Sequence, residues 1–370
     1  MMKINDRVMR GIAGLMLVLC IGFGLACVDD GGGKLYYAGW TVGDLWDGYG
    51  TILRSTDSGN TWVRQGSTNA SHPDYIAGVD MAGVVVVDPF TAWVVGSSDD
   101  GYATIYHTTD GGSTWARKGS AADVPDVDLV KVSAYGDSKV WAVGNTGVPI
   151  TSVIMHTSDG GVTWTNQIPA EYNDTQLQGV YTPDGTNMWV TGCNKDGYAL
   201  ILKSTDAGQT WTRQSGGDVT DLDHVLGVSA VDADTAWAMG GTGNAAGWIL
   251  LGTTDGGVTW TNQIQGAHDG NEVCAVSPSV VWAVGDSVLS WSIDGGLNFD
   301  QHTTYDYTMG ISAVSSQEAW AVRVGLGGTI YYTADGGSNW TVLNELDGEK
   351  LPSLWTVSFS TQPINMWQSE

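Results

Sequence analysis

After residue 34, short runs rich in Val, Ile, Trp and Thr alternate with glycine-containing turns almost to the end of the chain. Short runs of β-branched and aromatic residues bounded by turn residues are typical of β-strands. The hydrophobic pattern therefore predicts an all-β fold.

One turn motif, Ser/Thr-x-Asp-x-Gly-x-Thr/Asn-Trp, occurs seven times, and its aspartates lie 39 to 53 residues apart. Glycine adopts the positive φ of a tight turn without strain, and an aspartate side chain can accept hydrogen bonds from the turn backbone. We expect the turn to join the third and fourth strands of a repeat and its last aromatic residue to pack between neighbouring sheets. The aspartates and aromatic residues are Asp57, Asp110, Asp159, Asp206, Asp255, Asp294, Asp335, Trp62, Trp115, Trp164, Trp211, Trp260, Phe299 and Trp340.

Two strand motifs interleave with this turn. A run like Gly-Val-Ser-Ala precedes a run like Ala-Trp-Ala-Val-Gly, and the tryptophans of the second run are Trp93, Trp141, Trp189, Trp237, Trp282, Trp320 and Trp367. Four short strands in a unit of about 40–50 residues are typical of a propeller blade. We therefore predict a single seven-bladed β-propeller over residues 35–370, with the tryptophans in its core.

The two ends of this region compete for one position in the last blade. Residues 35–39 precede the first turn motif as a second strand would, and the run from Leu354 to Trp367 supplies an inner strand and another second strand. Joining the two ends closes the ring but leaves that blade with one strand too many, so either the last residues hang loose or the first run lies outside the sheet. We expect a loose tail after about Ser360.

Residues 1–27 form a separate unit. Basic residues precede a 16-residue apolar run, which is short for a membrane span but suits a secretory signal. Because the run ends at Cys27, it resembles a bacterial lipoprotein signal in which this cysteine bears the lipid. We expect lipidation of Cys27, a flexible glycine-rich tether at 28–34, and a location at the outer membrane or cell surface. Ordinary cleavage and secretion is the alternative.

Composition narrows the choice of partners. Charged residues make up 15 % of the chain, with 52 glycines and 18 tryptophans, which argues against disorder. Without residues 1–27 the chain keeps 12 basic and 39 acidic residues, so we expect no nucleic-acid partner.

Cys193 and Cys274 fall at different repeat positions. We expect two unpaired thiols there, with a disulfide as the alternative.

The connections opposite the aspartate turns are candidates for a binding surface. They vary more than the turns do, and variable loops on a rigid scaffold are where binding usually resides. We expect this acidic, aromatic face to receive a basic protein segment, a cation or a glycan, although acidic loops are also ordinary in an acidic secreted protein. The candidate residues are Trp46, Asp47, Asp100, Tyr102, Asp126, Asp128, Tyr172, Asp221, Asp223, His224, His268, His302 and Tyr305.

The seven turn motifs resemble the Asp-box (BNR) repeats of sialidases, sortilin-type receptors and xyloglucanases. Their alternation with Ala-Trp-Ala-Val-Gly strands over residues 35–370 looks most like the photosystem II stability and assembly factor group of propellers. That resemblance implies a scaffold that holds another protein during assembly, although the basic patch of those relatives is absent here. We expect a monomeric, non-catalytic binding protein. The alternative is a carbohydrate-binding or glycoside hydrolase-like secreted protein.

Sialidase activity finds no support in the arginines. Sialidases hold a carboxylate with three convergent arginines, whereas Arg64, Arg117 and Arg213 each follow a motif tryptophan and so fall on outer strands of different blades. Another glycosidase would need two carboxylates at a set separation. Some pair among the 39 acidic residues after residue 27 would meet this by chance, so the criterion decides nothing. We expect no catalytic residue and no cofactor.

The six histidines do not indicate a metal site. His107 and His156 lie three residues before motif aspartates, and we expect them on strand surfaces. The other four, which we place in the connections between blades, are His72, His224, His268 and His302. A copper or zinc site would need two or three of these to converge, so we expect no metal.

Overall fold

The computed structural model describes residues 35–67, 75–76, 78–147, 149–194, 196–214, 217, 219, 222–241, 247–266, 270–285, 287–304, 307–325 and 327–364. The predicted signal with Cys27, the tether and Trp367 lie outside these ranges. Within them, no helix has the length and apolar character needed to cross a membrane.

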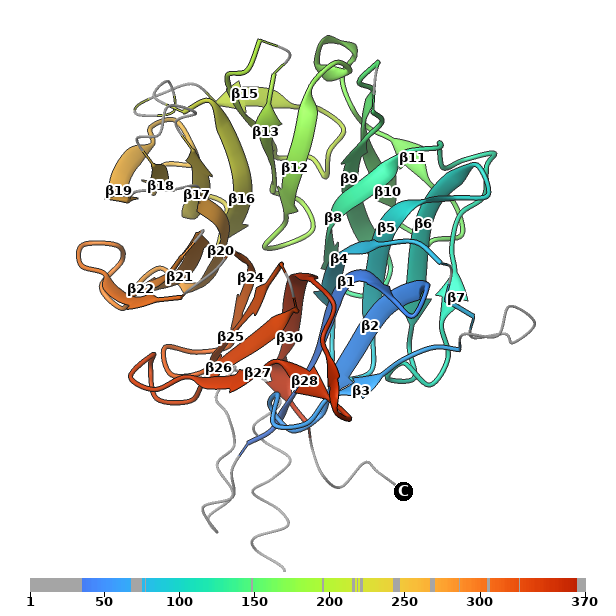
Figure 1. Ribbon diagram of the computed structural model, residues 1–370. Coiled ribbons are helices and arrows are strands. Elements are labelled where there is room, and N and C mark those ends of the chain that lie inside the picture. Colours follow the sequence, from blue (N-terminus) through green and yellow to red (C-terminus); the bar gives the residue numbers. More distant parts are fainter. Residues whose placement is uncertain are drawn as a thin grey trace, which may run out of the picture. The chain divides into compact units, whose positions relative to one another are not determined.

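From Tyr37 onward the chain forms a seven-bladed β-propeller, which confirms the predicted fold class (Figure 1). Six blades each consist of four consecutive antiparallel strands, numbered here from the inner strand outward. Blade 1 consists of β4(Met81–Val86), β5(Ala92–Asp99), β6(Tyr102–Thr108) and β7(Ala116–Arg117). Blade 2 consists of β8(Asp128–Tyr135), β9(Lys139–Asn145), β10(Ser152–Thr157) and β11(Thr165–Asn166). Blade 3 consists of β12(Gln176–Tyr181), β13(Met188–Cys193), β14(Ala199–Ser204) and β15(Thr212–Gln214).

Blades 4 to 6 repeat the same order. Blade 4 consists of β16(His224–Ala230), β17(Ala236–Gly241), β18(Trp248–Thr253) and β19(Thr261–Gly266). Blade 5 consists of β20(Gly270–Ser277), β21(Val280–Gly285), β22(Val288–Ser292) and β23(Asp300–Thr303). Blade 6 consists of β24(Thr308–Ala313), β25(Ala319–Arg323), β26(Thr329–Thr333) and β27(Thr341–Leu343). A small separate hairpin, β28(Glu345–Leu346) with β29(Glu349–Lys350), follows blade 6.

Blade 7 joins the two ends of the chain. Its inner strand is the C-terminal β30(Leu354–Pro363), followed outward by β1(Tyr37–Trp46), β2(Tyr49–Ser55) and β3(Val63–Arg64). The strand β30 stays paired with β1 as far as Pro363 opposite Tyr37, three residues beyond the expected start of a loose tail, and residues 365–370 lie outside the described ranges. The position that we gave to Trp367 belongs to Trp40, since β1 fills the second place of this blade.

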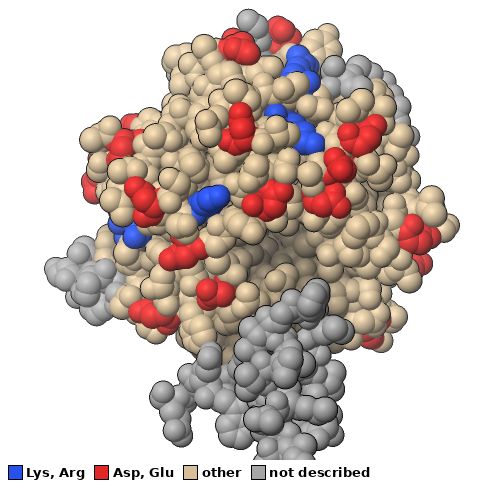
Figure 2. Space-filling model, turned by 180° about the vertical axis from the view of Figure 1, so that it is seen from behind, with Lys and Arg blue, Asp and Glu red and all other residues tan. Residues whose placement is uncertain are grey.

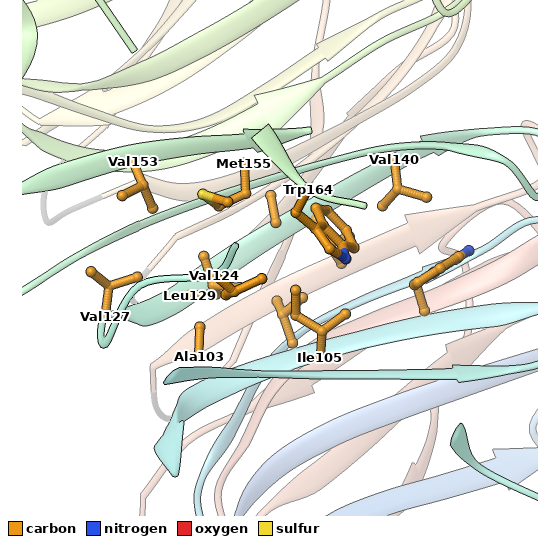
Figure 3. Close-up of a cluster of buried hydrophobic side chains, with 13 residues drawn as sticks. Ala103, Ile105, Val124, Val127, Leu129, Val140, Val153, Met155 and Trp164 are labelled. Atoms are coloured by element: carbon orange, nitrogen blue, oxygen red, sulfur yellow. The ribbon is translucent and has the colours of Figure 1, made fainter. Parts of the chain in front are cut away.

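Apolar side chains from facing blades form the core. Between blades 1 and 2, Ala103 and Ile105 of β6 meet Leu129 of β8 and Met155 of β10, and the cluster includes Trp164 (Figure 3). The remaining members come from β5, β8, β9 and β10 and from the connection that carries Val124 and Val127. Burial of such side chains stabilises a fold by about 1.5–3 kcal/mol each, so the blade junctions hold the ring together.

The seven aspartate turns share one hydrogen-bond pattern. In blade 2, Asp159 accepts hydrogen bonds from Thr163 N at 3.0 Å and from Thr163 Oγ1 at 2.7 Å. Thr157 Oγ1 donates to Asp159 Oδ1 at 2.7 Å, and Gly161 N donates to Thr157 Oγ1 at 3.0 Å. Gly161 has φ +78°, and a Cβ there would lie 2.9 Å from the indole of Trp93 in blade 1. The turn therefore needs glycine both for its φ and for its contact with the preceding blade.

A ring of side chains joins the inner strands. Ser133 Oγ accepts a hydrogen bond from Thr182 N of the next blade at 3.1 Å. The equivalent serines of three other blades also accept a hydrogen bond from a backbone N–H of the next blade at 3.0–3.1 Å: Ser229 from Ala275 N, Ser312 from Phe359 N, and Ser358 from Val86 N. Cys274 Sγ accepts one from Ala313 N at 3.3 Å. The two other junctions have Val85 and Tyr181 at this position. Five of the seven junctions are thus closed by the same side-chain hydrogen bond.

Each second-strand tryptophan faces a third-strand residue across the sheet. Trp93 is stacked on His107 with 3.9 Å between ring centroids, and Trp141 on His156 at 4.6 Å. Both histidines lie on strands, but each covers an indole, so that His107 is buried and His156 is half-buried rather than on the surface as predicted. Burial lowers the pKa of both side chains. The facing residues in blades 1 to 7 are His107, His156, Lys203, Gly252, Trp291, Tyr332 and Arg54.

Candidate functional site

The antiparallel order of the strands separates two rims. The aspartate turns and the connections from first to second strands lie on one rim, here called the turn rim. The connections from second to third strands and from one blade to the next lie on the other, here called the loop rim. The loop rim includes the hairpin tips at 47–48 and 100–101 and the connections at 118–127 and 167–175.

Most of the described candidate residues lie on the loop rim. Trp46 and Asp47 belong to the β1–β2 tip, and Asp100 and Tyr102 to the β5–β6 tip. Asp126 and Asp128 lead into β8, Tyr172 ends the 3₁₀ helix η1(Ala170–Tyr172), and Asp223 and His224 lead into β16. Asp221, His268 and Tyr305 lie outside the described residues.

His302 does not lie in an inter-blade connection as predicted. It is part of the outer strand β23, and its ring stacks on Trp340 of blade 6 with 6.0 Å between centroids. The outer strand of blade 5 extends further than the sequence pattern indicates because it pairs with β22 through Thr303. This contact uses His302 in the packing of two blades.

Arginines fix two hairpin tips of the loop rim. Asp47-Gly48 and Asp100-Gly101 have positive φ at both residues, as in the two-residue turns that Asp-Gly favours. In blade 7 the guanidinium of Arg64 lies 5.0 Å from the ring centroid of Trp46 and 3.7 Å from Asp47.

The same arrangement recurs in blade 1. Arg117 lies 4.1 Å from the ring centroid of Tyr102 and donates to Asp99 Oδ2 at 2.9 Å. Each arginine holds an aromatic ring against its own blade, so Asp47 and Asp100 are left exposed at the tips.

The arginine placement predicted from the repeat is confirmed. Arg64, Arg117 and Arg213 lie on β3, β7 and β15, which are outer strands of blades 7, 1 and 3. Arg54 lies over Trp40, and Arg323 donates to Gly327 O at 2.8 Å. These five arginines are all engaged locally and do not converge on one pocket.

Some acidic residues of the loop rim bond to a neighbouring blade or strand. Asp80 Oδ1 accepts a hydrogen bond from Leu45 N, and Asp128 Oδ1 accepts one from Ser98 N, both at 2.9 Å. Trp355 Nε1 donates to Asp44 Oδ1 at 2.5 Å. Other acidic side chains face solvent, and Figure 2 shows acidic groups spread singly over one face of the molecule with fewer basic groups among them.

The seven inner strands enclose a channel of about 380 Å³. Lys131 of blade 2 and Glu272 of blade 5 form an ion pair there, with side chains 20 % and 15 % exposed. Lys131 and Glu272 occupy a position of the inner strand at which other blades have glycine, for example Gly83 and Gly179. We did not single out this pair from the sequence, although a charged residue at a glycine position of the repeat was the signal for it.

Burial sets the chemistry of the channel. It raises the pKa of Tyr181 to about 12 and that of the Cys274 thiol to about 11. Cys274 is therefore a neutral thiol at pH 7, and both it and Cys193 are unpaired, as expected. Among the described residues, no three His, Cys, Asp or Glu side chains are placed to hold a metal ion.

No protein-family model matches the sequence, and no curated protein matches it. Solved structures with the same fold are similar to the chain. YCF48 bound to D1 peptide is 17 % identical, with a TM-score of 0.54 over 74 % of this chain and 84 % of that one. YCF48 from Cyanidioschyzon merolae is 15 % identical, with a TM-score of 0.52 over 73 % and 86 %.

A Mycobacterium tuberculosis puromycin-hydrolyzing peptidase is 12 % identical, with a TM-score of 0.56 over 82 % of this chain and 53 % of that one. At these identities the likeness shows the propeller fold alone, which serves binding proteins and enzymes alike.

Proposed function

We propose that this protein is a non-catalytic, envelope-anchored binding protein whose loop rim holds a protein partner through a basic segment of that partner. The observation that carries the proposal is the pair of arginine-fixed hairpin tips. Arg64 and Arg117 restrain Trp46 and Tyr102, so the exposed carboxylates of Asp47 and Asp100 are held in place before a partner arrives. A preorganised surface loses less conformational freedom on binding.

The fold neighbour adds support of a general kind. YCF48 has been solved with a D1 peptide, so a propeller of this fold holds a peptide in that protein. Acidic groups on a rigid ring attract basic segments and speed their encounter. The carbohydrate alternative has less support at Trp46 and Tyr102, because a guanidinium group already lies over one face of each ring and leaves less of it for sugar stacking.

The anchor belongs to the same proposal. The apolar run before Cys27 resembles a lipoprotein signal, and the glycine-rich segment after it would give the propeller reach from the membrane. Full-length protein should fractionate with membranes, and a Cys27→Ser variant should lose lipid labelling. A variant that keeps its lipid label would overturn the anchor.

Photo-cross-linking in the native envelope tests the binding rim. A photoreactive residue is placed at Leu45 on the loop rim or at Val162 on the turn rim, which are exposed by 41 % and 74 %. We expect protein adducts from position 45 that decrease at high salt, because exposed charges are screened. Mass spectrometry identifies the partner, and a glycan without protein in the adduct would favour the alternative.

Charge variants give the matched comparison. Asp47→Asn with Asp100→Asn should reduce the adduct several-fold. Asp234→Asn with Asp300→Asn removes the same charge from exposed positions elsewhere and should leave it unchanged. Equal loss in both double variants would show that only net charge matters and would contradict a specific site.

A further inference from the structure

A notch lies between blades 4 and 5 on the turn rim, away from the loop rim discussed above. Its volume is about 110 Å³. The indole of Trp237 contributes to its wall, and Gly252 faces that tryptophan across the sheet. The other lining residues are Thr253, Thr254, Thr259, Thr261, Gln263, Pro278 and Gly295.

The repeat shows what normally fills this space. In the six other blades, the residue that faces the second-strand tryptophan has a side chain of at least imidazole or lysine size. Blade 4 has glycine there, and Gly252 is in ordinary strand conformation, because it is absent from the positions with positive φ. The backbone therefore does not require glycine. The space that a side chain would take is shared by the notch and the flexible side chain of Gln263, which lies 3.1 Å from the position of a Cβ at residue 252.

Two blades fill the position with a cation. Lys203 Nζ lies 4.6 Å from the centroid of Trp189 and donates to Ala233 O at 2.6 Å and Gly256 O at 2.9 Å, both in the next blade. Arg54 of blade 7 lies 5.0 Å from the centroid of Trp40 and donates to a carbonyl of blade 1 at 3.0 Å. An indole face with carbonyl oxygens beside it is a receptor for an ammonium or guanidinium group.

The notch at blade 4 presents the same groups. In blade 4, Ala233 lies four residues before Trp237, and Gly256 directly follows the turn aspartate Asp255. The residues at the same two positions of blade 5 are Pro278 and Gly295, and both line the notch. The backbone around them is also repeated. Gly256 N donates to Asp234 O and Gly295 N donates to Ser279 O, each at 2.9 Å.

We propose that this notch binds a lysine or arginine side chain of a protein partner, in the place that Lys203 takes in blade 3. Exposed apolar residues within two positions of the lining residues would cover the aliphatic stem of that side chain, namely Val258, Ile293 and Leu297, which are 64–81 % exposed.

Charge around the notch is lower than around Lys203. Asp232, Asp234 and Asp255 surround that lysine, whereas the equivalent residues in blade 5 are Ser277, Ser279 and Asp294. The occupant is therefore held less tightly than Lys203 is, which suits reversible docking. The proposal does not depend on the loop rim.

Fluorine NMR of 5-fluorotryptophan-labelled protein provides the test. The probe is the peptide acetyl-Ala-Ala-Lys-Ala-Ala-amide, and the matched control carries Nε-acetyllysine. The resonance of Trp237, assigned with a Trp237→Phe variant, should shift and saturate with the lysine peptide and stay in place with the acetylated one. A shift with both peptides, or with neither, would overturn the proposal.

Two variants move the site in opposite directions. Gly252→Lys supplies the side chain from the same chain and should abolish the response of Trp237. The three atoms nearest to a new Cβ there belong to the flexible Gln263 side chain, at 3.1–3.2 Å. Lys203→Gly opens a matching notch over Trp189, whose resonance should then respond to the peptide. A Trp237 response that persists in Gly252→Lys, or an unresponsive Trp189 in Lys203→Gly, contradicts the assignment. Failure here leaves the cross-linking from position 45 unaffected, so the two proposals are separable.

Discussion

The turn rim and the loop rim of this propeller have the same number of blades to connect, but they do so differently. On the turn rim, the same aspartate accepts hydrogen bonds at the same offsets in every blade, from Asp57 to Asp335. On the loop rim, a two-residue turn at 47–48 contrasts with a 3₁₀ helix at Ala170–Tyr172. Repetition on one rim fixes the ring, and this leaves the connections of the other rim free to differ.

The largest effect should come from the core that the turn rim closes. Trp189→Ala removes an indole that is fully buried and lies edge-on to Trp260 with 5.5 Å between ring centroids. Loss of a buried large aromatic side chain costs about 3–5 kcal/mol, which urea denaturation would measure. Trp46→Ala on the loop rim, where the ring is only partly buried, is the control and should cost clearly less. Equal costs would remove the distinction between the rims.

A smaller, pH-dependent effect is expected from one turn aspartate. Hydrogen bonds from Thr163 N and Oγ1 and from Thr157 lower the pKa of Asp159 to about 2. Because this pKa is below that of an unfolded aspartate, about 3.9, its stabilisation is complete above pH 4 and is lost as the pH falls toward 2.

Asp159→Ala should therefore lower the urea midpoint at pH 7, and the difference from the unchanged protein should shrink between pH 4 and 2. Asp126→Ala, at an exposed loop-rim position, should shift the midpoint little at any pH. A difference for Asp159→Ala that stays constant with pH would show that its carboxylate charge is not what the turn uses.

The smallest effect should come from an arginine at the loop rim. Arg117→Met keeps the aliphatic stem but loses the contact with Tyr102 and the ion pair with Asp99. In that pair the side chain of Arg117 is 20 % exposed and that of Asp99 is 32 % exposed. Partly exposed pairs of this kind contribute about 1 kcal/mol or less. Hydrogen exchange should rise locally at residues 99–102 while the melting temperature changes little. A large drop in melting temperature would place this tip in the core of the fold.

The repeated elements were predictable, and features that depend on a single blade were not. Seven turn motifs predicted seven blades, since each copy carries its own aspartate, glycine and aromatic residue. The joining of the two ends in one blade was predictable, but its second-strand tryptophan was not, because Trp40 and Trp367 both follow the second-strand pattern and only the pairing of β1 with β30 selects Trp40. Histidines 107 and 156 were misplaced because no local pattern shows that a strand residue covers an indole of the adjacent strand.

The sequence by itself determined the number of blades, the turn chemistry and the composition of the core, because hydrogen bonds within eight residues and strand patterns within one repeat are local. The tertiary structure decided which residues meet across the ring. The pair of Lys131 and Glu272, 141 residues apart, and the notch left by Gly252 exist only because inner strands converge on one axis and neighbouring blades complete each other. Their partners are set by the closure of the ring, which no single repeat encodes.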